Sequence, residues 1–232
     1  MHRYLLVVLA SVLAGSALSL SIGVQSVSAS CSPSRPDQDF AGYAGTMDSP
    51  TVAPDGIKAD IEEYQPWVTD GSEVTGWVML NSGTSRWAQV GWIRSKDGGV
   101  YTRQVFVQYT NNAGTPVTSF WAGQSGTTNY RVDWDPAGDT FSFRRGGTII
   151  ATATLSWDVT DYQVFGETHR KSDQMPGGTT AHMDFTNTYM SPVGSASWFS
   201  LTSPVFTNQG TWYGALRVNS VRYEVWDKEC SS

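Results

Sequence analysis

The strongest constraint on the fold is a two-residue alternation of apolar and polar side chains in short segments. Ten segments show it: 74–80, 87–94, 102–110, 130–135, 140–145, 148–155, 162–169, 181–189, 212–218 and 222–226. Successive side chains of a β-strand point to opposite faces, and these segments are rich in β-branched and aromatic residues, so each is typical of a strand. No stretch carries a sustained helical period. The sequence therefore predicts an all-β protein.

Residues that favour turns separate the segments. The stretches 111–114, 136–139 and 146–147 have compositions typical of hairpin turns. Many antiparallel strands joined in this way favour a two-sheet antiparallel β-sandwich of jelly-roll or concanavalin-like type, with a closed barrel as the alternative. We find no internal repeat. We expect one sandwich domain over residues 57–232, preceded by an irregular N-terminal arm over 30–56 that is rich in Ser, Pro, Gly and Asp.

The N-terminus indicates export. An apolar stretch follows His2 and Arg3, and the small residues Val27-Ser28-Ala29 come after it, so residues 1–29 are typical of a signal peptide cleaved after Ala29. Serines dilute the apolar stretch and no second apolar span follows it, which disfavours a membrane span. A lipoprotein with Cys31 as the lipidated residue stays open as an alternative. We expect an extracellular protein.

The two cysteines lie at opposite ends of the mature chain. In an oxidising compartment, Cys31 and Cys230 are expected to form a disulfide that ties the termini together. Closing so long a loop contributes up to about 4–5 kcal/mol in the chain-entropy model.

The charge of the chain argues against a nucleic-acid partner. The net charge is −6, with 21 acidic against 15 basic residues, and no basic cluster is longer than Arg144-Arg145. Ten tryptophans and ten tyrosines supply more aromatic surface than a core of this size needs, and so leave enough for a binding groove.

Alternation also predicts which side chains share a face. One face of 87–94 carries Trp87, Gln89 and Gly91, whereas one face of 162–169 carries Gln163, Phe165, Glu167 and His169; Trp77 lies on the mixed face of 74–80. If these faces coincide, they form a groove with aromatic walls around Gln89 and Glu167. The alternative is an ordinary solvated sheet face, on which glutamine and glutamate are inert.

Several catalytic classes are disfavoured by the sequence. The stretch 123–126 (GQSG) is not a serine-hydrolase elbow, and the few histidines form no zinc motif. Asp133 and Asp135 lack the further oxygen ligands of a calcium loop, and no strand carries the glutamate pair of a sandwich glycosidase. We expect no metal and no cofactor. A single glutamate with an amide partner remains.

The segments 76–80 (GWVML), 87–92 (WAQVGW) and 164–167 (VFGE) resemble the glutamic peptidases, that is, the fungal eqolisins and the plant neprosin-type enzymes. The segment 87–92 is similar to the neprosin glutamate-alanine-glycine-tryptophan segment, with Gln89 in the place of the glutamate. The stretch 102–110 is similar to the strand that follows it in neprosins. The sequence departs from the eqolisin pattern at Asn81, Ser82 and Gln108, where that family keeps acidic residues.

The resemblance implies a function and a set of roles. Glu167 would act as general base on a water and Gln89 would donate to the oxyanion, while Trp77, Trp87, Phe165, Gln108 and His169 would contact a polypeptide substrate. It also implies cleavage of peptide bonds at acidic pH, by a protein that we expect to be a monomer.

Two other functions stay open at this stage. The first is a non-catalytic secreted sandwich that binds polysaccharide or a cell-surface polymer through exposed aromatic residues, for which Trp121, Trp134 and Trp198 lie near predicted turns. The second is an extracellular structural module without a groove. Whether Gln89 and Glu167 lie in one cleft separates these possibilities from the peptidase.

Overall fold

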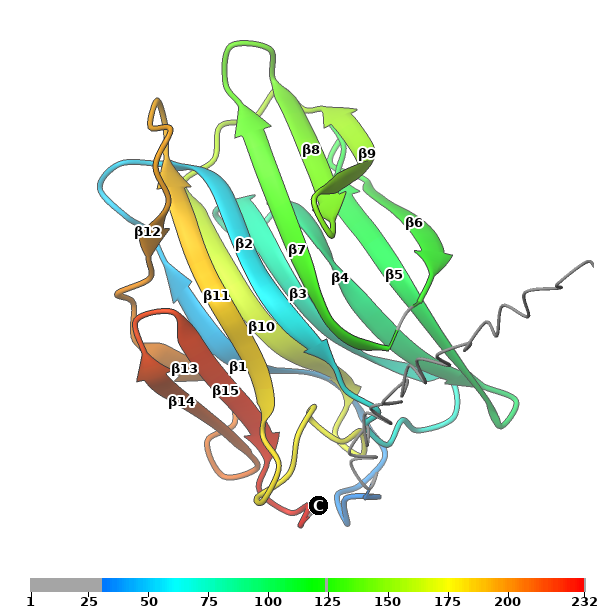
Figure 1. The fold of residues 1–232 in the computed structure, drawn as a ribbon. Helices are drawn as coiled ribbons and strands as arrows, with labels where there is room; N and C mark the ends of the chain where they lie inside the picture. Colours follow the sequence, from blue (N-terminus) through cyan, green and yellow to red (C-terminus); the bar gives the residue numbers. More distant parts are fainter. Residues whose placement is uncertain (1–30, 124, 232) are drawn as a thin grey trace, which may run out of the picture.

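The structure, a computed structural model, describes residues 31–123 and 125–231. Its strands form two antiparallel sheets that pack face to face (Figure 1). The seven-stranded sheet has the order β13 (Val205–Thr207), β1 (Asp39–Asp48), β10 (Asp161–Arg170), β3 (Ser72–Ser82), β4 (Arg86–Asp97), β5 (Val100–Thr110) and β6 (Pro116–Ala122). The described residues contain no helix.

The second sheet has eight strands. Its order is β14 (Tyr213–Asn219), β15 (Arg222–Asp227), β11 (Met183–Pro192), β2 (Pro54–Glu63), β7 (Gly126–Asp135), β8 (Thr140–Arg145) and β9 (Thr148–Thr154), and the short β12 (Phe199–Ser200) pairs with β11. The predicted all-β, two-sheet sandwich is therefore confirmed. The three predicted turns join β5 to β6, β7 to β8 and β8 to β9.

The core between the sheets follows from the alternation. On β4, Val90 and Trp92 point inward and are fully buried, whereas Gln89 and Gly91 point to the other face. From the opposite sheet, Ile57 and Phe143 meet this layer in the same core cluster. Because each strand places one apolar set between the sheets, the outer faces are left for other residues.

The prediction of an irregular arm over residues 30–56 is wrong in two places. Residues 39–48 form β1, and residues 54–56 begin β2. The reason lies in the glycines of β1. A Cβ at Gly42 would lie 2.5 Å from the Tyr213 ring, and one at Gly45 would lie 2.0 Å from the Val164 carbonyl oxygen. Close neighbours require glycine here, and glycine hides the alternation that marks other strands.

A disulfide joins the two ends of the described chain. Cys31 and Cys230 are bonded, with their Cα atoms 5.6 Å apart across 199 residues of sequence. The predicted pairing is therefore confirmed. A thiol in a disulfide cannot carry a lipid, so the structure does not support the alternative of lipidation at Cys31. The predicted signal peptide lies outside the described residues.

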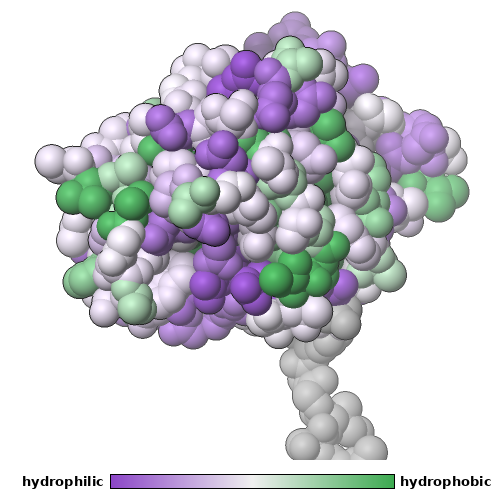
Figure 2. Space-filling model, turned by 90° about the horizontal axis from the view of Figure 1, so that it is seen from above, coloured by the Kyte–Doolittle hydropathy of each residue, from purple (hydrophilic) through white to green (hydrophobic). Residues whose placement is uncertain are grey.

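The described residues contain no helix long and apolar enough to cross a membrane. Seen from above, the surface mixes hydrophilic and hydrophobic residues, and the hydrophobic ones form small separate groups (Figure 2).

Candidate active site

The outer face of the seven-stranded sheet gathers the predicted site residues. Strand β3 lies between β10, which carries Glu167, and β4, which carries Gln89. Residues paired across antiparallel strands point to the same face of the sheet. The strand register gives three successive rows on this face, each read in the order β10, β3, β4. The rows are Glu167–Thr75–Ile93, Phe165–Trp77–Gly91 and Gln163–Met79–Gln89. The mixed polar and aromatic faces of β3, β4 and β10 therefore lie on the same side of the sheet, as predicted.

Two cavities open on this face and share three lining residues, Gln89, Gln108 and Glu167. The larger, of about 410 Å³, is also lined by Trp77 and Trp87, among others. The smaller, of about 310 Å³, reaches His169. We call the two cavities together the groove. The shared residues place the glutamate and the glutamine at its middle, with space on both sides of them.

Glu167 is buried, with 9% of its surface exposed. The Trp77 indole Nε1–H donates to its Oε2 at 2.8 Å, and the Thr75 hydroxyl lies 3.4 Å from the same oxygen. Burial raises the pKa of Glu167 above the ordinary value of a glutamate, while the nearby His169 and hydrogen bonds from Trp77, Tyr43 and Thr75 act in the opposite direction. A carboxyl group of this kind exchanges a proton at a higher pH than an exposed one.

His169 lies between two carboxylates at the mouth of the smaller cavity. Its Nε2 is 3.5 Å from Glu167 Oε1 and 3.5 Å from Glu73 Oε1, and 42% of its side chain is exposed. The ring is thus close enough to act on the charge of Glu167, while it stays open to solvent.

The Gln89 amide is held by a chain of hydrogen bonds along the sheet. Its Nε2 donates to Gln108 Oε1 at 2.8 Å, and Gln108 Nε2 donates to the Thr118 hydroxyl at 3.1 Å. The Trp87 indole donates to the same Gln108 oxygen at 3.3 Å. A primary amide has two N–H donors, so one N–H of Gln89 is left for a ligand while the other fixes the orientation of the group.

Trp77 reaches Glu167 because its neighbour on β4 has no side chain. A Cβ at Gly91 would lie 2.7 Å from Trp77 Cα and 2.1 Å from the Gly76 carbonyl oxygen. Beside Trp77 on the same sheet face, Phe165, Phe106 and Ile93 complete a second apolar cluster, separate from the main core. Glu167 therefore has apolar neighbours on its sheet face, which contributes to its desolvation.

Among the predicted contact residues, Phe165 lies outside the groove. It is 2% exposed and packs against Trp77, Tyr43 and Phe206, with ring centroids 5.4 to 5.9 Å apart. Trp77, Trp87, Gln108 and His169 all line one cavity or both. Phe165 packs edge-on against Trp77 as its cross-strand neighbour.

The sequence analysis missed Tyr43 of β1, which lines the larger cavity and interacts with Glu167. Burial and the negative charge of Glu167 raise the pKa of the Tyr43 phenol, so the group stays a proton donor. The alternation of Tyr43 and Met47 about Gly45 was the signal that could have identified this strand. In residues 31–123 and 125–231, no group of three or more His, Cys, Asp or Glu side chains could hold a metal ion.

Comparison with known proteins relates this architecture to one group of enzymes. No family model matches the sequence, and no curated protein matches it significantly. A structure of scytalido-glutamic peptidase with a peptide-based transition-state analogue aligns over 83% of this chain and 100% of its own, with a TM-score of 0.57 and 14% identity. The chain shares the fold of the glutamic peptidases.

Two further structures give the same result. A second scytalido-glutamic peptidase structure with a transition-state analogue has a TM-score of 0.54 and 11% identity, over 82% of this chain and 100% of its own. SCP-B, a member of the eqolisin family in complex with the tripeptide Ala-Ile-His, has a TM-score of 0.54 and 12% identity over the same shares. At these identities the likeness concerns the fold.

Proposed function

We propose that this protein is a secreted glutamic-peptidase-like endopeptidase that cleaves peptide bonds with Glu167 and Gln89. The observation that carries the proposal is that the two side chains line the same two cavities on one sheet face. The fold shared with peptidases, described in complexes with peptide-based ligands, agrees with it.

Glu167 has the properties of a general base. Its raised pKa brings the carboxylate closer to the pH at which proton transfer is efficient, and a carboxylate abstracts a proton from a water that attacks the scissile carbonyl carbon. The C–O bond to that water forms as the proton moves to Glu167. When the C–N bond of the tetrahedral intermediate breaks, the protonated Glu167 returns the proton to the leaving amine nitrogen.

Gln89 has the properties of an oxyanion donor. Its second amide N–H is available because Gln108 accepts the first. A preorganised donor of this kind aimed at the developing negative charge typically contributes about 3 kcal/mol, because it needs no reorganisation during the reaction. The carbonyl of the substrate and the attacking water would lie between Gln89 and Glu167, over Trp77.

The groove suits an extended peptide. It continues on both sides of Glu167, toward Trp87 in the larger cavity and toward His169 in the smaller one. Substrate residues on either side of the cleaved bond would each find a pocket with an aromatic or aliphatic floor, which favours an endopeptidase.

Digestion of a denatured protein tests the proposal. The wild type and the variants Glu167→Gln and Gln89→Ala are incubated with acid-denatured casein from pH 2 to 7, and new amino termini are measured. We expect Glu167→Gln to lose at least 10³-fold in rate and Gln89→Ala about 10²–10³-fold.

The matched control is Glu62→Gln, which makes the same change on β2 in the other sheet and should keep wild-type activity. Equal cleavage by the wild type and Glu167→Gln, or no cleavage by folded wild type at any pH, would contradict the proposal.

A further inference from the structure

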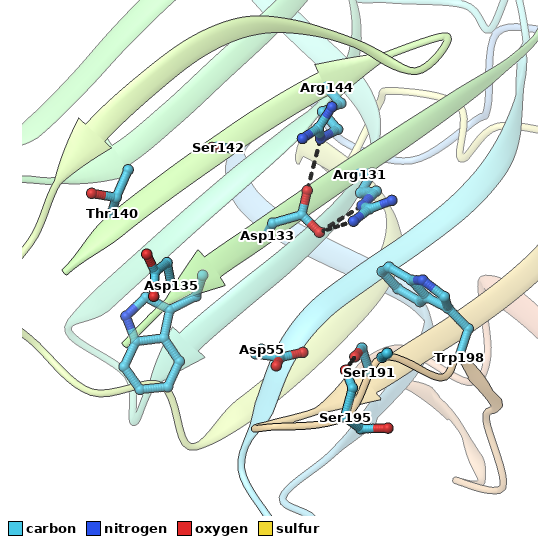
Figure 3. A pocket seen from close by; sticks show the side chains of 12 residues that line it. Asp55, Arg131, Asp133, Asp135, Thr140, Ser142, Arg144, Ser191, Ser195 and Trp198 are labelled. Atoms are coloured by element: carbon cyan, nitrogen blue, oxygen red, sulfur yellow. Dashed lines mark hydrogen bonds and ion pairs between the residues drawn. The ribbon is translucent and has the colours of Figure 1, made fainter. Parts of the chain in front are cut away.

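A further cavity, of about 490 Å³, lies on the eight-stranded sheet (Figure 3), whereas the groove lies on the seven-stranded sheet. On β7, Val132 is buried in the core, so Arg131 and Asp133 point outward on either side of it. The neighbouring β8 contributes Ser142 and Arg144, and the loop after β11 covers one side with Trp198. We call this cavity the second pocket.

The two arginines of the second pocket are both paired with one of its carboxylates. Asp133 accepts from Arg131 Nε at 2.5 Å through one oxygen and from Arg144 Nε at 2.8 Å through the other. Asp55 and Asp135 complete the charged lining, so three acidic groups face two basic ones. Because both guanidinium groups already pair with Asp133 and the acidic groups outnumber the basic ones, the pocket disfavours an anionic ligand such as a phosphate or sulfate.

The remaining lining is rich in hydrogen-bonding groups. Hydroxyls come from Thr140, Ser142, Ser191 and Ser195. Trp134 contributes to the edge of this lining, but its side chain belongs to the core cluster, where its ring stacks against Phe141.

Trp198 forms a fixed apolar wall. A Cβ on Gly56 would lie 2.7 Å from the six-membered ring, so β2 has room for this side chain only because residue 56 is glycine. Lys58 Nζ and Arg131 Cζ lie 4.3 and 4.5 Å from the ring centroid. These contacts hold the indole in place and leave it among the residues that line the pocket.

We propose that the second pocket binds a neutral oligosaccharide. Such a ligand has many hydroxyls that both donate and accept, together with apolar C–H faces. The planar groups of Arg131, Asp133 and Arg144 are preoriented by their ion pairs for such hydroxyls, and Trp198 offers apolar surface. Because Asp133 already pairs with both arginines, the pocket suits a neutral ligand better than an anionic one.

The second pocket and the groove lie on different sheets, so a glycan and a peptide could bind at the same time. A glycan held there would anchor a secreted protein to a polymer surface without blocking the groove. This inference does not depend on peptidase activity.

Calorimetric titration with neutral hexaoses tests the inference. Cellohexaose, laminarihexaose, xylohexaose, maltohexaose and chitohexaose are titrated into the wild type, Ser142→Tyr, Trp198→Ala and Glu167→Gln. Ser142→Tyr fills the pocket from a partly exposed strand position and removes no core packing. We expect at least one hexaose to bind the wild type, with an affinity at least tenfold lower in Ser142→Tyr and Trp198→Ala and unchanged in Glu167→Gln.

Thermal unfolding of each variant confirms that it is folded before titration. Failure of all five hexaoses to bind the wild type would overturn the inference. Binding that Ser142→Tyr leaves unchanged would overturn it as well, because the ligand would then lie elsewhere.

Discussion

At the scale of single residues, the properties of the groove depend on how Glu167 is surrounded. Its carboxylate is buried next to an apolar cluster, which raises the pKa, and it accepts a hydrogen bond from the Trp77 indole N–H, which lowers the pKa. Burial is the larger of the two effects. The pH dependence of both activity and stability should therefore follow this residue.

Replacing Trp77 by phenylalanine should raise the pKa of Glu167 further. The ring stays over Phe165, but the 2.8 Å hydrogen bond to the carboxylate is lost. A hydrogen bond to a charged group contributes about 1.5–3 kcal/mol, so the acidic limb of kcat/KM should move upward by about one pH unit. Trp87→Phe, whose indole donates to Gln108, is the control and should leave the limb in place. If the acidic limb of kcat/KM stays in place in Trp77→Phe, the hydrogen bond from Trp77 does not set the pKa of Glu167.

Glu167 should also make stability depend on pH. Its pKa is raised in the folded state above the ordinary value of about 4.3 expected in the unfolded chain. Its contribution is therefore fully present below that value and is lost as the pH rises through the folded pKa. Relative to the wild type, Glu167→Gln should gain stability between pH 3.5 and pH 7. Urea unfolding at the two pH values measures this, and a constant difference would contradict it.

At the scale of strands, close approach between neighbours decides which side chains the groove receives. Gly91 on β4 leaves room for Trp77 on β3, and Gly45 on β1 leaves room for the ring of Phe165 on β10. Both glycines occupy positions at which a side chain would collide with backbone atoms. The close pairing of β3 with β4 at this point therefore requires a glycine at position 91.

Gly91→Ala should destabilise the protein. The added Cβ would meet the Gly76 carbonyl oxygen at 2.1 Å, so the two strands would have to separate or shift. Overpacking of this kind costs about 1–3 kcal/mol, measured as a lower urea midpoint. Gly138→Ala is the matched control, because its Cβ would meet no atom closer than 3.4 Å. Equal midpoints for the two variants would contradict the assigned role of Gly91.

At the scale of the whole molecule, the Cys31–Cys230 disulfide joins the two ends of the described chain. Both ends lie at the lower edge of the sandwich in Figure 1. A buried ion pair between Arg35 and Asp227 lies close to the disulfide in sequence, and the Arg35 guanidinium packs 5.1 Å from the Tyr213 ring. The disulfide and the ion pair both attach the residues before β1 to the C-terminal strands.

Removing the disulfide should lower stability and leave the groove intact. In Cys31→Ser/Cys230→Ser, a loop of 199 residues opens, which costs up to about 5 kcal/mol in the chain-entropy model. Gln89 and Glu167 lie on β4 and β10, which are held in the sheet by their pairing with β3, so peptide cleavage well below the melting temperature should persist. Calorimetry and the casein assay measure the two effects. A melting temperature equal to that of the wild type would contradict the first expectation.

Much of the fold can be predicted from local pattern. Period-two alternation and turn residues predicted the sandwich and the inward and outward sets of β3, β4 and β10. The two cysteines at the ends of the mature chain, together with the expected oxidising compartment, predicted the disulfide. Alternation also placed Gln89 and Glu167 on the mixed polar and aromatic faces of their strands. Successive side chains of a strand point to opposite faces, so an odd or even position, its parity, decides the face.

Tertiary structure decided the rest. Strand order brought β3 between Glu167 and Gln89, and β1, whose glycines conceal its alternation, brought Tyr43 to the same carboxylate. The burial of Phe165 and the pocket around Asp133 arise from contacts between strands distant in sequence. Parity tells which way a side chain points, but only the packing of the sheets determines which other side chains it meets and how much water remains there.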